Sequence, residues 1–289
     1  MRLIPLAVVG LLALSAAPAA AQQAGASTAP DPAAGFDPNA DRISVAVGAV
    51  NLPDYEGSDS YRWTAAPAAV GSIKGYSFAL LGNRVSVDLV RDRSDSNIDF
   101  ELGPIGVINF NRSSTKDIDD ARVRALGKVG TAVELGGYVG IGKRGVITSP
   151  YDKLSATVSY RHDVSGKHDS YVVTPAINYL TPLSRKAGVG LFATMDIAGG
   201  GYSRTYESVS AAQSLASGLP VYTAHGGVKS YTLGAAGTIA VTGDLLHGLS
   251  LVAGGAYTRE LNSWSYSPLT RVAGTPNQWI GAVGLGYTF

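Results

Sequence analysis

The chain has 289 residues and a formal net charge of +1, and 45% of its residues are hydrophobic but only 16% are charged. This apolar content excludes a disordered chain, and the balanced charge gives no electrostatic basis for binding nucleic acid. Ordinary soluble domains carry roughly 25% charged residues and about 7% Gly, whereas this chain is poor in charge and contains 36 Gly and no Cys. Stability must therefore come from packing or from a closed sheet.

The first residues have the organisation of a secretory signal peptide. A positive Met1-Arg2 precedes an apolar run that ends at Leu14, and the small residues that follow favour cleavage after Ala21. The apolar run is shorter than the ~20 residues that a spanning helix needs. Residues 22–40 are rich in Ala and Pro without any period, which predicts a flexible periplasmic segment before a domain over residues 41–289.

From residue 41 onward, large apolar residues alternate with small or polar ones, and this period of two predicts β-strands. In residues 153–163, for example, a row of Leu, Ala, Val and Tyr alternates with a row of Ser, Thr and Arg. We expect twelve strands, near residues 42–51, 63–72, 75–82, 84–91, 98–111, 129–142, 153–163, 169–181, 187–206, 228–241, 249–261 and 277–289. Ten strands are the alternative, because the short segments between 63 and 91 have the weakest pattern.

The length of these strands indicates a membrane protein. Strands of soluble proteins average 5–6 residues, whereas membrane-spanning strands need about 9–11. In the closing segment WIGAVGLGYTF, Trp279 and Phe289 end one apolar row, and at ~3.3 Å per residue and a ~40° tilt they lie roughly 25 Å apart along the axis. Because unpaired backbone groups cannot face hydrocarbon, we predict an all-β fold, a closed antiparallel transmembrane β-barrel in the outer membrane.

Successive strands of an antiparallel barrel alternate in direction, so successive connections alternate between the two sides of the membrane. If the last strand runs toward the periplasm, this parity assigns a side to every connection. The short turns at 182–186 and 242–248 then lie in the periplasm. The long connections all lie outside the cell, at 52–62, 112–128, 207–227 and 262–276. Long outer loops and short inner turns are typical of such barrels.

Several charged residues occupy rows that would face the lumen. They are Arg84, Asp88, Asp99, Glu101, Glu134, Arg161 and Asp196. Such residues could form a charged, selective channel or a buried catalytic group. We favour a hydrogen-bonded polar network that fills a narrow barrel.

Other patterns give weak signals for chemistry. Two His-Asp pairs at 162–163 and 168–169 and the acidic run 117–120 contain groups that can activate water, but nothing in the sequence fixes their mutual geometry. The carboxylates within 54–59 suit Ca²⁺ without the spacing of a dedicated loop. The glycines of 136–142 lie inside a strand pattern with no helix after them, unlike a phosphate-binding loop. We therefore expect no catalytic residue, no metal site and no cofactor.

Four segments together are similar to the MipA/OmpV family of outer-membrane proteins. They are PDYEGSDSYR, the segment SAAQSLASGLPVYTAHGGVKSYTL at 210–233, LNSWSYSPLT at 261–270, and the closing GLGYTF. Their order covers nearly the whole mature chain. The positions that match the family's loop motifs are Tyr55, Gly57, Ser58, Ser217, Gly218, Pro220, Tyr222, Ser267 and Pro268.

The resemblance implies partners as well as a fold. Leu285, Tyr287 and Phe289 resemble the signal that is read by the outer-membrane barrel-assembly machinery. The family implies a non-enzymatic scaffold, embedded in outer-membrane lipid, that links a lytic murein transglycosylase with a peptidoglycan synthase. A narrow pore or small-solute channel is the alternative. Parity places the motif loops outside the cell, whereas murein enzymes act in the periplasm. Either contact uses the short turns and residues 22–40, or the loops fold into the lumen, or this chain has another function.

Overall fold

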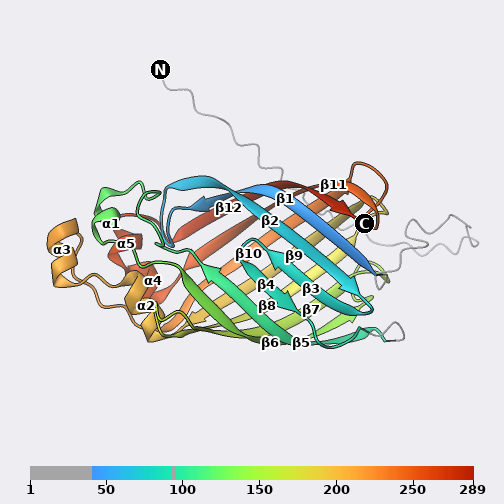
Figure 1. The fold of residues 1–289 in the computed structure, drawn as a ribbon, viewed down its shortest axis with the longest axis horizontal. Helices are drawn as coiled ribbons and strands as arrows, with labels where there is room; N and C mark the ends of the chain where they lie inside the picture. Colours follow the sequence, from blue (N-terminus) through green and yellow to red (C-terminus); the bar gives the residue numbers. More distant parts are fainter. Residues whose placement is uncertain (1–40, 93–95) are drawn as a thin grey trace, which may run out of the picture.

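The structure is a computed structural model that describes residues 41–92 and 96–289. The described residues form a closed antiparallel barrel of twelve strands, in which each strand pairs with its neighbours in sequence and β1 pairs with β12 (Figure 1). The strands are β1 (Arg42–Pro53), β2 (Tyr61–Ile73), β3 (Tyr76–Leu81), β4 (Arg84–Val87), β5 (Ile98–Asn109), β6 (Ala132–Arg144), β7 (Lys153–Asp163), β8 (Tyr171–Pro182), β9 (Ala187–Ala198), β10 (Gly227–Ala240), β11 (Gly248–Glu260) and β12 (Asn277–Thr288). The predicted fold class and strand number are confirmed, and the alternative of ten strands is wrong. The predicted signal peptide and the segment 22–40 lie outside the described residues.

The alternation in the sequence separates a lipid face from a lumen face. On β12, Trp279 and Phe289 are each 65% exposed and stand at opposite ends of the outer row, with Leu285 between them. Gly284 and Gly286 of the same strand belong to the inner row. Large apolar side chains that point outward into lipid and small ones that point inward are the arrangement expected of a membrane barrel.

The barrel closes where β1 meets β12. The two strands pair from Ser44 opposite Thr288 to Asn51 opposite Gly281. At the middle of this seam Gly48 lies opposite Gly284, and a Cβ on Gly48 would stand 2.6 Å from the carbonyl oxygen of Val283. Only glycine allows the two backbones to approach so closely.

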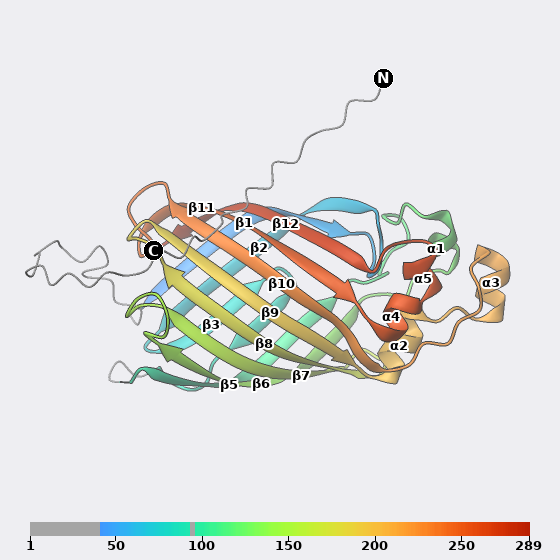
Figure 2. The same cartoon turned by 180° about the vertical axis from the view of Figure 1, so that it is seen from behind.

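The two ends of the barrel differ in structure (Figures 1 and 2). The long connections gather at one end, called here the loop end, and contain five short helices within the described residues. These are α1 (Ala121–Ala125), α2 (Gly200–Glu207), α3 (Ala211–Ser217), α4 (Asn262–Tyr266) and α5 (Pro268–Arg271). The opposite end, called here the terminal end, holds Phe289 and the short turns that follow β8 and β10. This division of long and short connections agrees with the parity argument.

One predicted strand was too long. The segment 187–206 ends as a strand at Ala198 and continues as helix α2. The glycines at 199–201 interrupt the strand pattern. Tyr202 and Tyr206 are four residues apart, so they lie on the same face of the helix, and both are buried there. No helix in the described part of the chain is long and apolar enough to cross a membrane.

The hairpin of β3 and β4 is shorter than the segments 75–82 and 84–91 predict. β3 has six residues and β4 has four. β3 pairs with β2 only along Ala68–Ile73, so the residues of β2 before Ala68 pair with β1 alone. The hairpin therefore reaches only part of the way toward the loop end.

The position of Phe289 allows its thermodynamic and assembly roles to be separated. Its backbone N–H donates to Ile43 at 2.9 Å, and its ring lies on the lipid face at the terminal end. A charge near a membrane interface costs a barrel only about 0–1 kcal/mol. Phe289→Asp should therefore change the stability of folded protein little, but should lower its yield in the outer membrane several-fold if the terminal residue is an assembly signal. Heat-modifiable migration on a gel measures the folded fraction.

Trp279→Asp is the matched control, because it places the same charge at the other end of the same row. An equal loss of yield in both variants would show that Phe289 has no special role in assembly.

Candidate functional site: a lumen sealed at the loop end

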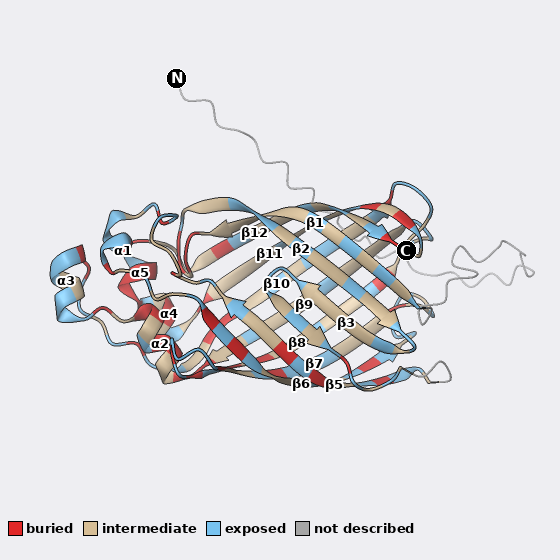
Figure 3. Ribbon diagram, in the orientation of Figure 1, coloured by how far each residue is buried: buried red, intermediate tan, exposed pale blue. Residues whose placement is uncertain are grey.

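The loops at the loop end pack into a cap with its own apolar core (Figure 3). One cluster joins residues from all of these loops and includes Tyr55, Ile118, Val123, Leu219 and Leu269, each at most 2% exposed. Tyr55 also donates hydrogen bonds to the carbonyl oxygens of Ala273 at 2.6 Å and Leu269 at 3.3 Å. Burial of this many apolar side chains, at about 1.5–3 kcal/mol each, indicates a fixed structure rather than a set of mobile loops.

A second cluster lies between the cap and the barrel wall. Trp264 of α4 and Tyr202 and Tyr206 of α2 pack against Val172 and Ala198, at the ends of β8 and β9. The rings of Tyr202 and Tyr206 are 4.6 Å apart between centroids. These contacts fix the helices over the mouth of the barrel, so the loop end of the lumen is covered by packed side chains.

Most of the family-motif residues are structural parts of this cap. Tyr55 and Ser58 are buried, and the carbonyl oxygen of Gly57 accepts from the N–H of Thr275 at 2.7 Å. Ser267 caps the N-terminus of α5, with Pro268 as its first residue, and donates to the carbonyl oxygen of Glu207 at 3.0 Å. Serine at the cap and proline at the next position are the residues that a helix start favours.

The motif residues around α3 also cap a helix, here at its C-terminal end. Ser217 donates to the carbonyl oxygen of Gln213 at 2.6 Å, and Gly218 ends the helix with a φ of 74°, a left-handed conformation that glycine adopts without strain. Tyr222 donates to the carbonyl oxygen of Ser263 at 2.9 Å, which ties this loop to α4. Pro220 is exposed.

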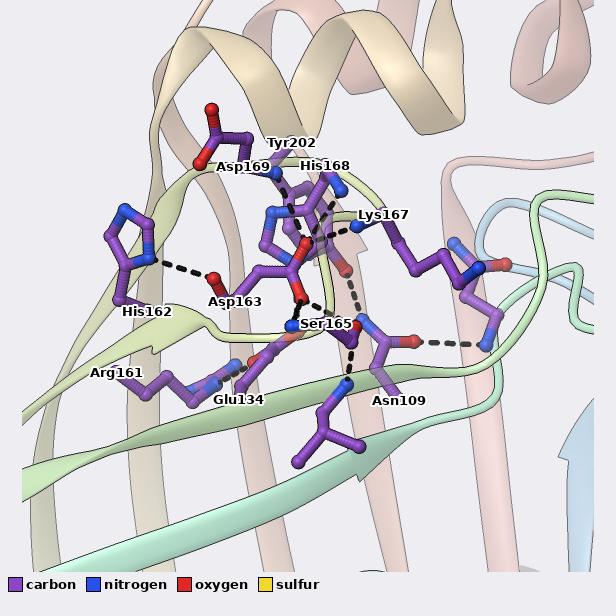
Figure 4. A network of polar contacts seen from close by, with 12 residues as sticks. Asn109, Glu134, Arg161, His162, Asp163, Ser165, Lys167, His168, Asp169 and Tyr202 are labelled. Carbon is purple, nitrogen blue, oxygen red and sulfur yellow. Dashed lines mark hydrogen bonds and ion pairs between the residues drawn. The ribbon is translucent and has the colours of Figure 1, made fainter.

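Beneath the cap lies a layer of paired charges (Figure 4). Glu134 accepts from Nε of Arg161 at 2.5 Å and from Asn109 at 3.0 Å, and it contacts His168 at 3.3 Å. Arg161 also donates to Thr174, at 3.0 Å. Two of the predicted lumen residues, Glu134 and Arg161, are thus brought together across the adjacent strands β6 and β7.

The layer continues toward β9 and β10. Thr174 donates to Asp196 at 2.6 Å, and Lys229 contacts Glu56 at 2.7 Å and Asp196 at 3.7 Å. Tyr202 donates to the same carboxylate oxygen of Glu56 at 2.8 Å. The breaking of a buried ion pair by removal of one partner typically costs 3–5 kcal/mol, so this layer ties the first loop of the cap to the barrel wall.

Of the remaining predicted lumen residues, Asp88, Asp99 and Glu101 lie nearer the terminal end. Lys153 pairs with Asp99 at 2.6 Å and with Glu101 at 3.1 Å. Asp88 accepts from the backbone N–H groups of Val90 at 2.9 Å and Leu102 at 3.1 Å. Arg84 lines a cavity of about 250 Å³ together with Asp88 and Glu101.

The aspartate of the first histidine-aspartate pair has a structural role in a turn. The carboxylate of Asp163 accepts from the backbone N–H groups of Ser165, Lys167, His168 and Asp169, at 2.6 to 3.1 Å. It therefore holds the turn between β7 and β8, as such local side-chain bonds often do.

The acidic side chains of the first loop point to different partners. Asp54 accepts from the N–H of Asp119 at 3.1 Å, and Glu56 binds Lys229. Within the described residues, no group of three or more His, Cys, Asp or Glu side chains is arranged to hold a metal ion.

Sequence reasoning missed several of the charged lumen residues, among them Lys153 and Lys229. Lys153 shares its row with Ser155, Thr157 and Arg161, so the alternation itself could have identified it. Strict alternation puts Lys229 on the outer row with Tyr231, but the register shifts between Val228 and Ser230, and Lys229 is only 6% exposed. A β-bulge redirects a side chain in this way, and nothing in the sequence marks its position.

A closed barrel with an apolar exterior and a lumen that is covered at one end defines a membrane barrel of the outer-membrane class. A family model described as MltA-interacting protein MipA matches residues 45–289. The chain belongs to this family, which confirms the resemblance in the sequence, and it is an outer-membrane barrel protein. No curated protein matches the sequence.

Solved structures with a similar architecture are distant. An outer-membrane channel from Pseudomonas putida F1 is 13% identical, with 88% of this chain and 97% of that chain covered, at a TM-score of 0.44. The toluene transporter TodX of Pseudomonas putida is 10% identical, with coverages of 90% and 91% and a TM-score of 0.36. A FadL homologue of Pseudomonas aeruginosa is 9% identical, with coverages of 86% and 89% and a TM-score of 0.30. Similarities at this level give no information on cargo or partners.

The cap contains a buried carboxyl group, Glu207, whose ionised form is disfavoured by burial. Burial raises the pKa of Glu207 to about 8, and the nearby carboxylate of Glu56 acts in the same direction, against Arg112 and Lys229. In the opened cap the pKa returns toward 4.5. Opening therefore releases a proton between about pH 4.5 and pH 8, and the closed cap loses stability as the pH rises through this range.

We expect the population of opened cap to rise with pH, by up to about tenfold per unit. Hydrogen exchange of the amides in α2 and α4 measures it. Glu207→Gln keeps the shape without the titration, so it should show no such slope between these pH values. A slope that is the same in both proteins would contradict this role of Glu207.

Proposed function

We propose that this barrel is a non-enzymatic scaffold of the outer membrane that binds murein-remodelling enzymes, a lytic transglycosylase and a peptidoglycan synthase, at its terminal end. The description of its family as MltA-interacting supports the class of partner. The cap supports contact at the terminal end. Within the cap, Tyr55, Ser58, Ser267 and Pro268 are buried or begin a helix. These motif residues are therefore unavailable to a partner.

The terminal end offers a surface on the correct side of the membrane. In barrels of this type the short turns lie in the periplasm, where murein and its enzymes are found. The turns carry large exposed apolar side chains, which include Ile147 at 68% and Leu183 at 63%. This arrangement removes the conflict between outward-facing motif loops and a periplasmic partner, because the loops fold over the lumen.

Site-specific photocrosslinking in intact cells tests the side of contact. A photoreactive amino acid at Leu183 or Ile147 should capture a murein transglycosylase or synthase, identified by mass spectrometry. The control position is Leu215 of α3, which is 91% exposed at the opposite end and should capture neither. Capture from Leu215 alone would refute a terminal-end scaffold, and recovery of no murein enzyme from any position would refute the scaffold itself.

A narrow pore is the second candidate, and the lumen itself favours it. The cavity of about 250 Å³ around Arg84 shares lining residues with a larger cavity of about 680 Å³. A conducting path would also have to cross the layer of Glu134 and Arg161 and the packed cap above it. Such a pore would open only if the cap moved.

Conductance in planar bilayers separates the two candidates. We expect the purified protein to show no steady open channel at neutral pH, because Trp264, Tyr202 and Tyr206 close the loop end. A reproducible open channel whose ion selectivity changes in Arg161→Gln would establish the pore and displace the scaffold as the leading function.

A further inference from the structure

The lumen contains a large cavity that reaches the terminal end. It has a volume of about 680 Å³ and is lined near its mouth by Pro182, Leu245 and Thr288, which belong to the turns and strand ends there. Ligand sites in proteins commonly measure about 300–1,000 Å³. The polar layer and the cap cover the other end of the lumen, so a ligand of this cavity would enter from the periplasm.

One side of this cavity is made of small apolar residues. Ala46, Ala68, Ala236, Gly190 and Gly286 line it. Each belongs to a lumen-facing row, because Ala46 pairs with Ala68 and Gly286, and Ala236 pairs with Gly190. The absence of long side chains on this wall leaves a smooth apolar surface that suits a hydrocarbon chain.

Charged residues line the region where this cavity meets a second one. The larger cavity shares Ser77, Phe78, Asp92 and Lys153 with the smaller one of about 250 Å³ around Arg84. The two cavities therefore adjoin at these four side chains, and the larger one combines its apolar wall with charged residues such as Arg42 and Arg144.

The acidic groups of the inner cavity all have partners. Glu101 binds Lys153 at 3.1 Å, and Asp92 lies 3.9 Å from Arg144. Asp88 accepts two backbone N–H groups. Their charges are therefore already balanced or hydrogen-bonded by the protein.

Arg84 differs from these groups. Its guanidinium makes no hydrogen bond or ion pair with any residue that the structure describes, although it lines the inner cavity. A guanidinium presents five N–H donors in a planar fork that matches a carboxylate or phosphate group. Arg84 is thus a cation with open donors in the polar part of the lumen, near enough to Asp196 and Arg161 for their charges to act on it.

We infer that the lumen binds a single-chain amphiphile whose oxyanion head group lies on Arg84 and whose hydrocarbon tail lies along the alanine and glycine wall. The head group is a carboxylate or a phosphate, because both match the fork. The tail points toward the terminal end, where the molecule enters and leaves. This site is independent of the proposed scaffold function, since the protein surface that would hold an enzyme is on the turns outside it.

Photolabelling tests this site in purified protein held in phosphatidylcholine nanodiscs. The probe is a hexadecanoate that carries a diazirine on its tail, and mass spectrometry locates the labelled residues. We expect labelling of lumen-facing residues on β10 and β12, and competition by unlabelled hexadecanoate. Arg84→Gln should reduce lumen labelling about tenfold or more, as the loss of a charge-assisted bidentate contact predicts. Arg62→Gln, at the loop end on an ion pair with Asp117, should leave it unchanged.

Further arms separate the chemistry of head and tail. Hexadecyl phosphate should compete as well as hexadecanoate if the site accepts either oxyanion. It should compete better if the natural ligand carries a phosphate, and worse if the natural ligand carries a carboxylate. Hexadecanol and acetate should compete poorly, because the first lacks the charge and the second lacks the tail. Equal competition by hexadecanol would overturn the role of Arg84.

A second variant tests the apolar wall without a change of charge. Ala236→Phe fills the cavity and should abolish lumen labelling, with the folded fraction checked by heat-modifiable migration. Labelling confined to lipid-facing side chains in the unaltered protein would overturn the site, as would lumen labelling that survives in both folded variants.

Discussion

Every other feature of this molecule depends on the closure of one hydrogen-bonded sheet. Lipid offers no partner to backbone N–H and C=O groups, so β1 must pair with β12. Closure in turn imposes glycine at the seam, where Gly48 meets Gly284. It also creates an interior in which the lumen-facing side chains must either pack or find polar partners. The barrel meets that second demand in two ways, with small apolar residues along β10, β12 and β1 and with paired charges along β5, β6 and β7.

The cap and the polar layer beneath it act as one unit. Glu56 belongs to the first loop, yet its carboxylate binds Lys229 of β10 and the hydroxyl of Tyr202 in α2. Loops far apart in the sequence are therefore held by the same few groups. In this chain the Ser, Pro, Gly and Tyr residues of these loops cap helices, end them and bridge neighbouring backbones.

The barrel could be predicted from the sequence because alternation, strand length and the aromatic ends of the last strand are local signals. The family followed from the resemblance of four segments, and the inward rows of charge followed from the alternation. Glu134 and Arg161 do meet in the lumen. The cap could not be predicted. Its helices are four to eight residues long, too short for a helical period to show, and they are stable only through tertiary packing. Lys229 was hidden by a bulge, and the open donors of Arg84 depend on the placement of every neighbouring side chain.

The short β3–β4 hairpin gives the barrel an uneven outer height. A strand needs about 9–11 residues to cross the hydrocarbon layer, whereas β3 and β4 have six and four, or about 20 and 13 Å at 3.3 Å per residue. The strands of this hairpin are therefore much shorter than β10 and β11, which have 14 and 13 residues. Lipid responds to such mismatch by local thinning, and a barrel responds by tilting. The wall along β3 and β4 is thus the part of the barrel where the shortest strands meet the lipid.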